Sequence, residues 1–246
     1  MKALKFTLKG QTAFFKKPDV NTYLYFTYGN IHKIAVLGIL GAVLGFGGYN
    51  QQDKEAIYPE FYDKLKAIKI AVVPLNERAY IPKRVQKFNN SVGYASKEAG
   101  GNLIVTEQWL EKPRWEIYVE LNNNIYGEKI LDSFKNNKFV FMPYLGKNDH
   151  FADIDDVEEV ELHECREVNK IHSLFLKKYF EILNNDSLDL FDEEEITWKY
   201  EERLPVALEE STNQYITERM VFTNACVALK EEYDIYSTGD KNLFLF

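Results

Sequence analysis

The segment from residue 79 to residue 102, AYIPKRVQKFNNSVGYASKEAGGN, brings cationic and aromatic side chains together over a short length of chain. Its cations and rings include Lys83, Arg84, Lys87, Phe88 and Tyr94. Cations suit the phosphates of a polyanion, and aromatic rings stack on unpaired bases. The composition therefore favours a nucleic-acid-binding segment, the alternative being a surface loop that is only solvated.

A second group of the same kind lies near the start of the chain. It comprises Lys16, Lys17, His32 and Lys33, with aromatic residues between them. This group precedes an aliphatic stretch, residues 34–48, that is expected to form a helix. Because the free N–H groups at a helix start favour an anion, we predict that these four side chains also contact nucleic acid.

The aliphatic stretch allows several interpretations. A membrane anchor is disfavoured, because residues 34–48 provide only 15 uncharged positions, whereas a spanning helix needs about 20. A phosphate-binding loop is disfavoured too, since no Gly-Lys-Ser/Thr follows and the glycine spacing does not match the dinucleotide fingerprint. The stretch is best interpreted as a core helix.

Glycines recur within this predicted helix. Gly38, Gly41 and Gly45 are spaced so that they share one helical face, and Gly47 and Gly48 follow as helix breakers with exposable backbone N–H groups. Each helical glycine costs about 1 kcal/mol relative to alanine. We therefore expect a neighbouring backbone to pack closely against this face.

The sequence provides no pattern for a metal, a cofactor or a catalytic residue. Residues 162–172, LHECREVNKIH, do not match the HExxH motif, and the acidic residues 153–164 lack the glycine and glutamate placement of a calcium loop. A G-x-S-x-G nucleophile elbow is also missing. We predict no metal, no cofactor and no catalytic site.

Charge is distributed unevenly along the chain. The net charge is −8, but residues 1–150 contain 21 Lys and Arg against 14 Asp and Glu, and residues 151–246 contain 9 against 24. The first part can face a polyanion and the second repels one. The two cysteines do not form a disulfide framework, and the first residues lack a long apolar segment, so a cytoplasmic location is expected.

Hydrophobic periodicity predicts an α+β fold of the ferredoxin-like, RRM-type βαββαβ class. The expected elements are strands at 4–10, 67–75, 102–110, 114–121 and 138–145, and helices at 31–46, in part of 55–65, and at 125–137. The basic segment forms a projecting hairpin, the thumb, at about 79–105. Residues 1–150 are expected to form the core, with 151–246 as an acidic, irregular portion packed on it. That portion is expected to contain a helix near 169–183 and strands near 203–209 and 219–229.

Three segments resemble a known family. Residues 15–49 (FKKPDVNTYLYFTYGNIHKIAVLGILGAVLGFGGY), 106–119 (TEQWLEKPRWEIYV) and 143–154 (PYLGKNDHFADI) are similar, in this order, to the CRISPR-associated Cas-five proteins of type I-B, within the RAMP superfamily. The resemblance implies a ferredoxin-like subunit of Cascade, the guide-RNA surveillance complex of antiviral defence. Such a subunit binds the 5′ handle of the crRNA beside the terminal backbone subunit and the large subunit, and meets target DNA only through the complex.

The resemblance also bears on catalysis. One branch of the family, in type I-C systems, cuts precursor RNA with a Tyr, a Lys and a His. This sequence has no adjacent Lys-His pair after its third strand; His32-Lys33 is reversed and misplaced, and His150 follows the last predicted core strand. We therefore expect a non-catalytic binder, with a metal-independent endoribonuclease and a scaffold unrelated to RNA as the alternatives.

Overall fold

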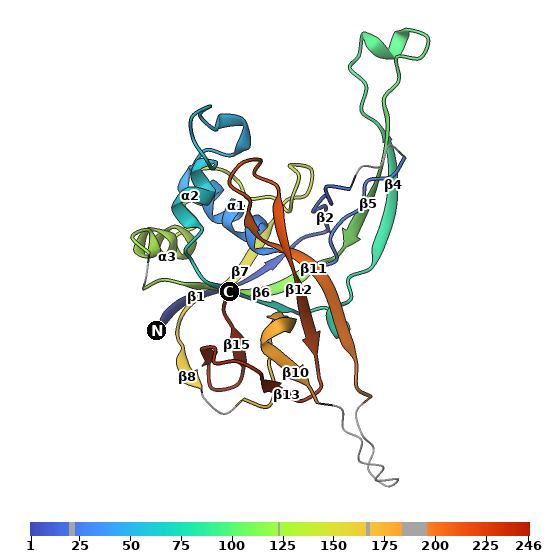
Figure 1. The fold of residues 1–246 in the computed structure, drawn as a ribbon. Coiled ribbons are helices and arrows are strands. Elements are labelled where there is room, and N and C mark those ends of the chain that lie inside the picture. The colour runs from blue at the N-terminus through green and yellow to red at the C-terminus, as the bar shows by residue number, and fades with distance from the viewer. Residues whose placement is uncertain (20–22, 123, 166–167, 184–195) are drawn as a thin grey trace.

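The computed structural model describes residues 1–19, 23–122, 124–165, 168–183 and 196–246. Its centre is a four-stranded antiparallel sheet in the order β3-β6-β1-β7. The strands are β1 (Lys2–Lys9), β3 (Ile70–Pro74), β6 (Arg114–Glu120) and β7 (Asp153–Glu161), with helix α1 (Lys33–Leu44) after β1 and helix α3 (Gly127–Lys135) after β6. This connectivity is the predicted ferredoxin-like βαββαβ core, so the α+β class is confirmed (Figure 1).

Helix α1 is apolar on nearly every side, as a fully packed core helix must be. Its residues between Ile34 and Leu44 pack into the main hydrophobic core with Leu4, Phe6 and Leu8 of β1. The helix ends at Gly45, whose left-handed backbone (φ +83°) directs its N–H toward carbonyls of the last turn.

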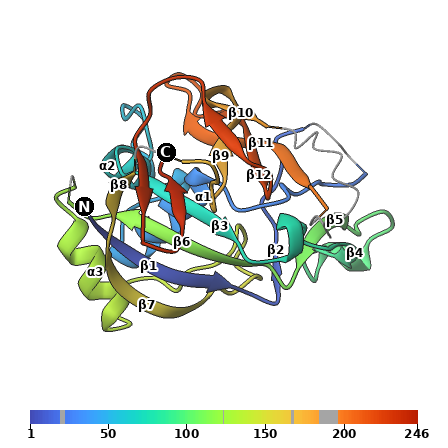
Figure 2. The same ribbon diagram turned by 90° about the horizontal axis from the view of Figure 1, so that it is seen from below.

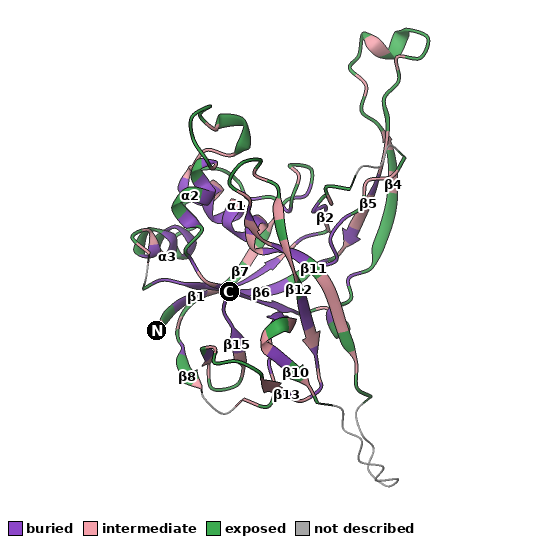
Figure 3. Cartoon of the chain, in the orientation of Figure 1, coloured by how far each residue is buried: buried purple, intermediate pink, exposed green. Residues whose placement is uncertain are grey.

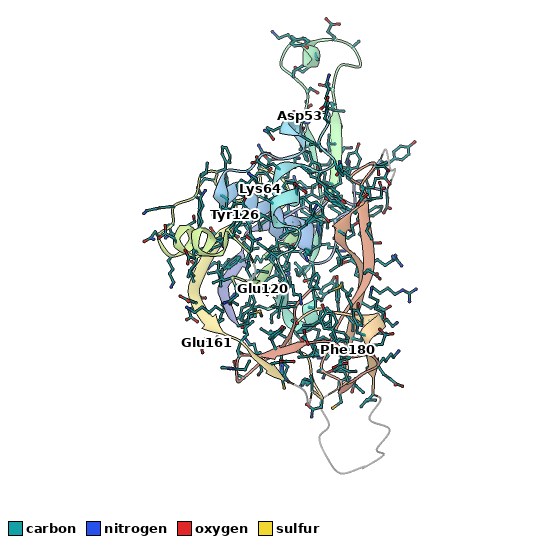
Figure 4. All side chains as sticks on the ribbon, turned by 60° about the vertical axis from the view of Figure 1, so that its left-hand side comes forward. Asp53, Lys64, Glu120, Tyr126, Glu161 and Phe180 are labelled. Carbon is teal, nitrogen blue, oxygen red and sulfur yellow. The ribbon has the colours of Figure 1, made fainter. Side chains whose placement is uncertain are left out.

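Helix α2 (Glu60–Leu65) packs beside α1 and starts directly after Pro59. A Cβ atom added at Gly41 would lie 2.5 Å from Cβ of Phe61, so glycine is what allows this close contact. Beside this contact, the Lys64 ammonium lies 4.3 Å from the ring of Phe46, which meets Tyr126 edge-on at 5.0 Å. Figure 4 labels Lys64 of α2 and Tyr126 before α3 on this side of the molecule. The prediction of close packing thus holds at Gly41.

The fourth core strand lies later in the sequence than predicted. Residues 138–145 do not form a strand: Val140 and Phe141 are exposed, and their N–H groups donate to carbonyls of Val43 and Ala42 at the end of α1. The strand is instead the acidic β7, whose carboxylates pair with lysines of β1. These pairs are Lys2–Glu159 (2.8 Å), Lys5–Glu158 (3.1 Å) and Lys9–Asp155. The core sheet therefore extends past residue 150, where the acidic portion was predicted to start.

The thumb is a long hairpin that projects from the body (Figure 1). It consists of β4 (Lys83–Asn89) and β5 (Ile104–Glu111), and β5 also pairs with β2 (Thr12–Ala13). A 3₁₀ turn, η3 (Ala95–Lys97), lies at the tip, and another, η2 (Glu77–Ala79), precedes β4. Figure 3 shows that most of this hairpin is exposed, whereas α1 and β1 are buried. The predicted thumb is therefore present.

The described C-terminal portion is built from strands, two of them long and the others of two or three residues. They are β8 (His163–Cys165), β9 (Phe175–Leu176), β10 (Phe180–Ile182), β11 (Lys199–Leu208), β12 (Tyr215–Thr223), β13 (Val227–Leu229), β14 (Ile235–Ser237) and β15 (Asn242–Phe244). This portion also contains the 3₁₀ turn η4 (Lys177–Tyr179), and a further 3₁₀ turn, η1 (Tyr49–Gln51), follows α1. The predicted strand pair corresponds to β11 and β12. The helix predicted at 169–183 is wrong, because β9 pairs with β12 and β10 with β13. Residues 184–195 of the acidic region lie outside the described residues.

The second face of the core sheet is covered by the chain itself. Leu243 and Leu245, in and after β15, form a second apolar cluster with Val73 and Tyr118 of the sheet. Figure 2 shows the ribbon of β15 on this side of the sheet. On the same face, the buried carboxylate of Glu116 accepts hydrogen bonds from the Tyr118 hydroxyl (2.6 Å) and the Lys241 ammonium (2.6 Å). RRM-type proteins bind RNA on this face of the sheet, and here the C-terminal residues of the chain cover it. Across the described part of the chain, every helix is too short or too polar to span a bilayer.

The two central glycines of α1 should respond oppositely to the same substitution. Gly41→Ala forces a methyl group into Phe61, and overpacking of this kind costs about 1–3 kcal/mol, so its melting temperature should fall. Gly38→Ala meets no heavy atom within 4 Å and gains helix propensity, so its melting temperature should stay equal or rise. Thermal denaturation of both variants checks this, and equal behaviour of the two would contradict it.

Candidate nucleic-acid interface

A groove of about 720 Å³ lies along one side of α1. Its floor is formed by residues of the helix and its cap, which include Ile34, Ile39 and four small residues: Ala35, Gly38, Ala42 and Gly45. These four positions are half-buried, whereas the other residues of α1 beyond its first turn are buried. The glycine face predicted from the sequence is therefore split: Gly41 packs against α2, while Gly38 opens into the groove.

Aromatic rings form the walls of the groove. They come from separate segments of the chain and are Phe14, Phe15, Phe46, Tyr49, Phe61, Phe141, Tyr144 and Tyr215. Gly47 and Gly48 line one end, but their N–H groups already donate to Glu60 (2.7 Å) and to the Gln51 side chain (3.0 Å). The free backbone donors expected at these two glycines are therefore engaged within the protein.

His32 lies at the start of α1, among the residues that line the groove. It is the N-cap of the helix, and its ring nitrogen accepts a hydrogen bond from the Ala35 N–H (3.3 Å). The rings of Tyr28 and Tyr215 meet it edge-on, each at 5.3 Å. Burial lowers the pKa of His32 to about 3. The ring is therefore uncharged at neutral pH and provides no positive charge for a phosphate.

The three lysines predicted near the groove are not brought together. Lys16 lines the groove, with its ammonium 3.9 Å from the ring of Tyr25. Lys17 is instead ion-paired with Glu202 (2.8 Å). Lys33 is half-buried outside the groove lining, and burial lowers its pKa to about 8. Lys16 is thus the one of the three lysines that lines the groove.

Strand alternation separates the cations of the thumb. In β4 successive side chains point to opposite faces, so Lys83 and Lys87 share one face and Arg84 and Phe88 share the other. The Arg84 face also carries Trp109, which is opposite Arg84 in the register and 6.1 Å from Phe88 between ring centroids. Tyr94 is 80% exposed near the tip. The predicted cluster of three cations therefore divides between two surfaces.

A partly buried cluster, with His150 and Glu107 at its centre, fixes the base of the thumb. The His150 ring lies 4.6 Å from Trp109 in a perpendicular arrangement, and its Nδ1 is 2.6 Å from the Thr12 hydroxyl. The Trp109 indole N–H donates to Glu107 (2.8 Å), which also pairs with Lys147 (3.2 Å). These contacts join the hairpin to the loop after residue 145, so the thumb has a defined direction.

Lys147 connects the two surfaces. Its ammonium lies 4.8 Å from the Phe88 ring on the thumb, while the preceding residue, Gly146, lines the groove. Sequence reasoning missed Lys147, Trp109 and Tyr144 as site residues. The only signal that included them was the set of segments 106–119 and 143–154, which carry the family resemblance.

Glu202 attaches the C-terminal sheet to the segment before α1. Its carboxylate accepts hydrogen bonds from the Gly29 N–H (2.7 Å) and the Tyr200 hydroxyl (2.5 Å), in addition to the pair with Lys17. Part of the acidic excess of the C-terminal portion is therefore used inside the protein. Among the described residues, no three His, Cys, Asp or Glu side chains gather in a way that could hold a metal ion.

Buried His32 should make stability depend on pH. Its pKa is about 3 in the folded chain, against an ordinary value near 6.5, so below pH 6.5 the unfolded state binds the extra proton. The free energy of unfolding should therefore fall as pH drops from 7 toward 4. In His32→Asn, which keeps a capping oxygen, this fall should be shallower. Urea denaturation at several pH values checks this, and parallel curves for parent and variant would contradict it.

Comparison with known proteins supports the fold. No protein-family model matches the chain, and no curated protein matches it either. Among solved structures, a CRISPR protein from Archaeoglobus fulgidus is similar, with a TM-score of 0.52 and 11% identity over 99% of this chain and 98% of that chain. A chain of a CRISPR RNA-guided surveillance complex aligns with a TM-score of 0.49 and 13% identity over 92% of this chain and 91% of its own. The chain therefore shares its fold, over nearly its whole length, with the Archaeoglobus fulgidus CRISPR protein.

Proposed function

We propose that this chain is a non-catalytic crRNA-binding subunit of a type I-B Cascade complex, holding the 5′ handle of the guide RNA. The observation that carries the proposal is the position of Lys147, which joins the aromatic groove to the thumb face of Arg84 and Phe88. The shared fold with a CRISPR protein and the resemblance of residues 15–49 support the same role.

The two joined surfaces have the composition of a single-strand binder. Lys16 and Tyr144 line the groove, and Phe88 and Arg84 continue the surface onto the thumb beyond Lys147. These five residues define a track for the RNA. Cations at intervals can follow a phosphate backbone while rings between them stack on bases. Because the second face of the core sheet is covered by β15, an RNA strand would follow this track and not the sheet.

The remaining surfaces suit protein partners. Val85, Val92, Leu103 and Ile104 of the thumb are each about half exposed. Exposed apolar residues grouped on one element indicate a contact with another protein. We infer that these residues meet the backbone or large subunit of the complex, that target DNA is met only through the complex, and that the assembly works in the cytoplasm.

Two double variants with equal charge loss should separate the track from the opposite thumb face. Lys16→Ala/Arg84→Ala removes two cations from the track, whereas Lys83→Ala/Lys87→Ala removes two from the other face. For single-stranded RNA the slope of log affinity against log salt changes by about 0.7 per phosphate contact, so the first variant should lose roughly 1.4. The second should keep the parental slope.

The measurement is affinity for a 5′-handle RNA over a salt series, with circular dichroism as the folding control. If only the Lys83/Lys87 variant weakens binding, the RNA follows the opposite face and the proposed track is wrong. If both variants keep the parental affinity and slope, phosphate contacts lie elsewhere.

Absence of catalysis is the second part of the proposal. His150 is buried, its Nδ1 is engaged by Thr12, and burial lowers its pKa, so it is poorly placed to exchange protons with RNA. We expect the purified chain to leave repeat RNA intact during prolonged incubation in EDTA. Specific cleavage that disappears in His150→Ala would instead support the endoribonuclease alternative.

A further inference from the structure

The groove beside α1 is chemically different from a phosphate site. Among the described residues that line it, Lys16 has the only charged side chain, and His32 is uncharged at neutral pH. The remaining lining is aromatic, aliphatic, amide or glycine backbone. A phosphate placed deep in this groove would lose its hydration without gaining a second cation. The groove therefore suits a flat, uncharged group with polar edges.

Gly38 forms the middle of the groove floor, and no packing contact explains it. A Cβ atom built there has no heavy atom within 4 Å outside the helix backbone, whereas at Gly41 the same atom would meet Phe61. The backbone of Gly45 is left-handed, which accounts for that glycine. Gly38 lowers helix propensity without such a compensation. A glycine of this kind is expected where a ligand must approach the backbone closely.

We propose that the groove is a nucleobase pocket, in which an unpaired base of the bound RNA lies against the bare helix face at Gly38. The proposal rests on the proposed function and specifies which part of the RNA enters this site. The base is placed between the Gly38 floor and the aromatic walls that include Tyr49, Phe141 and Tyr144. Its own phosphate remains outside, near Lys16.

The volume of the groove and its position next to the thumb agree with a nucleobase pocket. A volume of about 720 Å³ lies in the range of pockets that enclose small organic ligands, which extends from roughly 300 to 1,000 Å³. Tyr144 and Phe141 are both half exposed, so their rings are accessible to a ligand that enters from outside. Gly146 lines the groove next to Lys147, so a strand leaving the pocket meets the thumb directly.

Gly38 also provides a direct test, because a side chain there points into the groove and not into the core. Gly38→Leu should fill the pocket, and the loss of one stacked base should weaken binding of the 5′-handle RNA roughly tenfold. Gly38→Ala should also weaken binding, by less than Gly38→Leu, because its single methyl group already separates the base from the helix backbone. The salt slope of Gly38→Leu should equal the parental slope, since no phosphate contact is removed. Its melting temperature should not fall.

An RNA series with single abasic nucleotides identifies the base itself. For the parent protein, one abasic position should cause a loss similar to that of Gly38→Leu. For Gly38→Leu, the same abasic position should cause no further loss. Gly38→Met, which also favours a helix, replaces the leucine variant if the latter is destabilised, and the abasic series on the parent protein does not depend on either variant.

Each outcome either supports or contradicts the nucleobase pocket. If Gly38→Leu binds the handle like the parent while Lys16→Ala/Arg84→Ala weakens binding, RNA binding stands and the pocket is wrong. If Gly38→Leu weakens binding but no abasic position does, the groove contacts something other than a base. If the parent protein does not bind the RNA at all, the proposed function and the pocket fail together.

Discussion

Helix α1 is packed on every side except one, and the rest of the molecule depends on that asymmetry. The contact of Gly41 with Phe61 sets α2 directly against α1, and the apolar side chains of α1 pack on β1. The remaining face, with Ala35, Gly38 and Ala42, has no side chain large enough to cover it. Close packing on one side of the helix and an open groove on the other thus arise from the same run of small residues.

The neighbouring elements keep this groove in a fixed position relative to the thumb. His32 satisfies the first turn of α1 as an uncharged cap, and Glu202 holds the segment before the helix against the C-terminal sheet. The cluster of His150, Trp109 and Glu107 then fixes the hairpin beside it. The acidic C-terminal portion therefore has a structural role in the core, through ion pairs, besides any contact with partners.

Much of the fold could be predicted from the sequence because strong local patterns agreed with the tertiary structure. The alternation in β1 indicates a strand, and the uncharged run of α1 is too short for a membrane span and matches no phosphate-binding loop, which leaves a core helix. Strand β7 could not be recognised, because a bulge at Asp156 (φ +50°) breaks its period of two, and its carboxylates pair with β1 lysines that are distant in sequence. Propensity also cannot show that residues 169–183 form strand pairs with partners some 45 residues away.

The candidate site was only partly predictable for the same reason. The cations of the thumb were found by composition, but their division between two faces depends on which residues form β4. Lys147 carries no local signal, since its importance comes from its contact with Phe88 across the fold. Gly38 and Gly41 look equivalent in the sequence, and only the position of Phe61 separates a packing glycine from an open one.

The central claim is that RNA lies along the groove and the adjoining face of the thumb. Photo-crosslinking of a 5′-handle RNA that carries 4-thiouridine, followed by mass spectrometry of the crosslinked peptides, tests this most directly. We expect crosslinks within residues 46–51, 141–147 and 84–88. Crosslinks confined to β14, β15 or the edge strand β7 would contradict it.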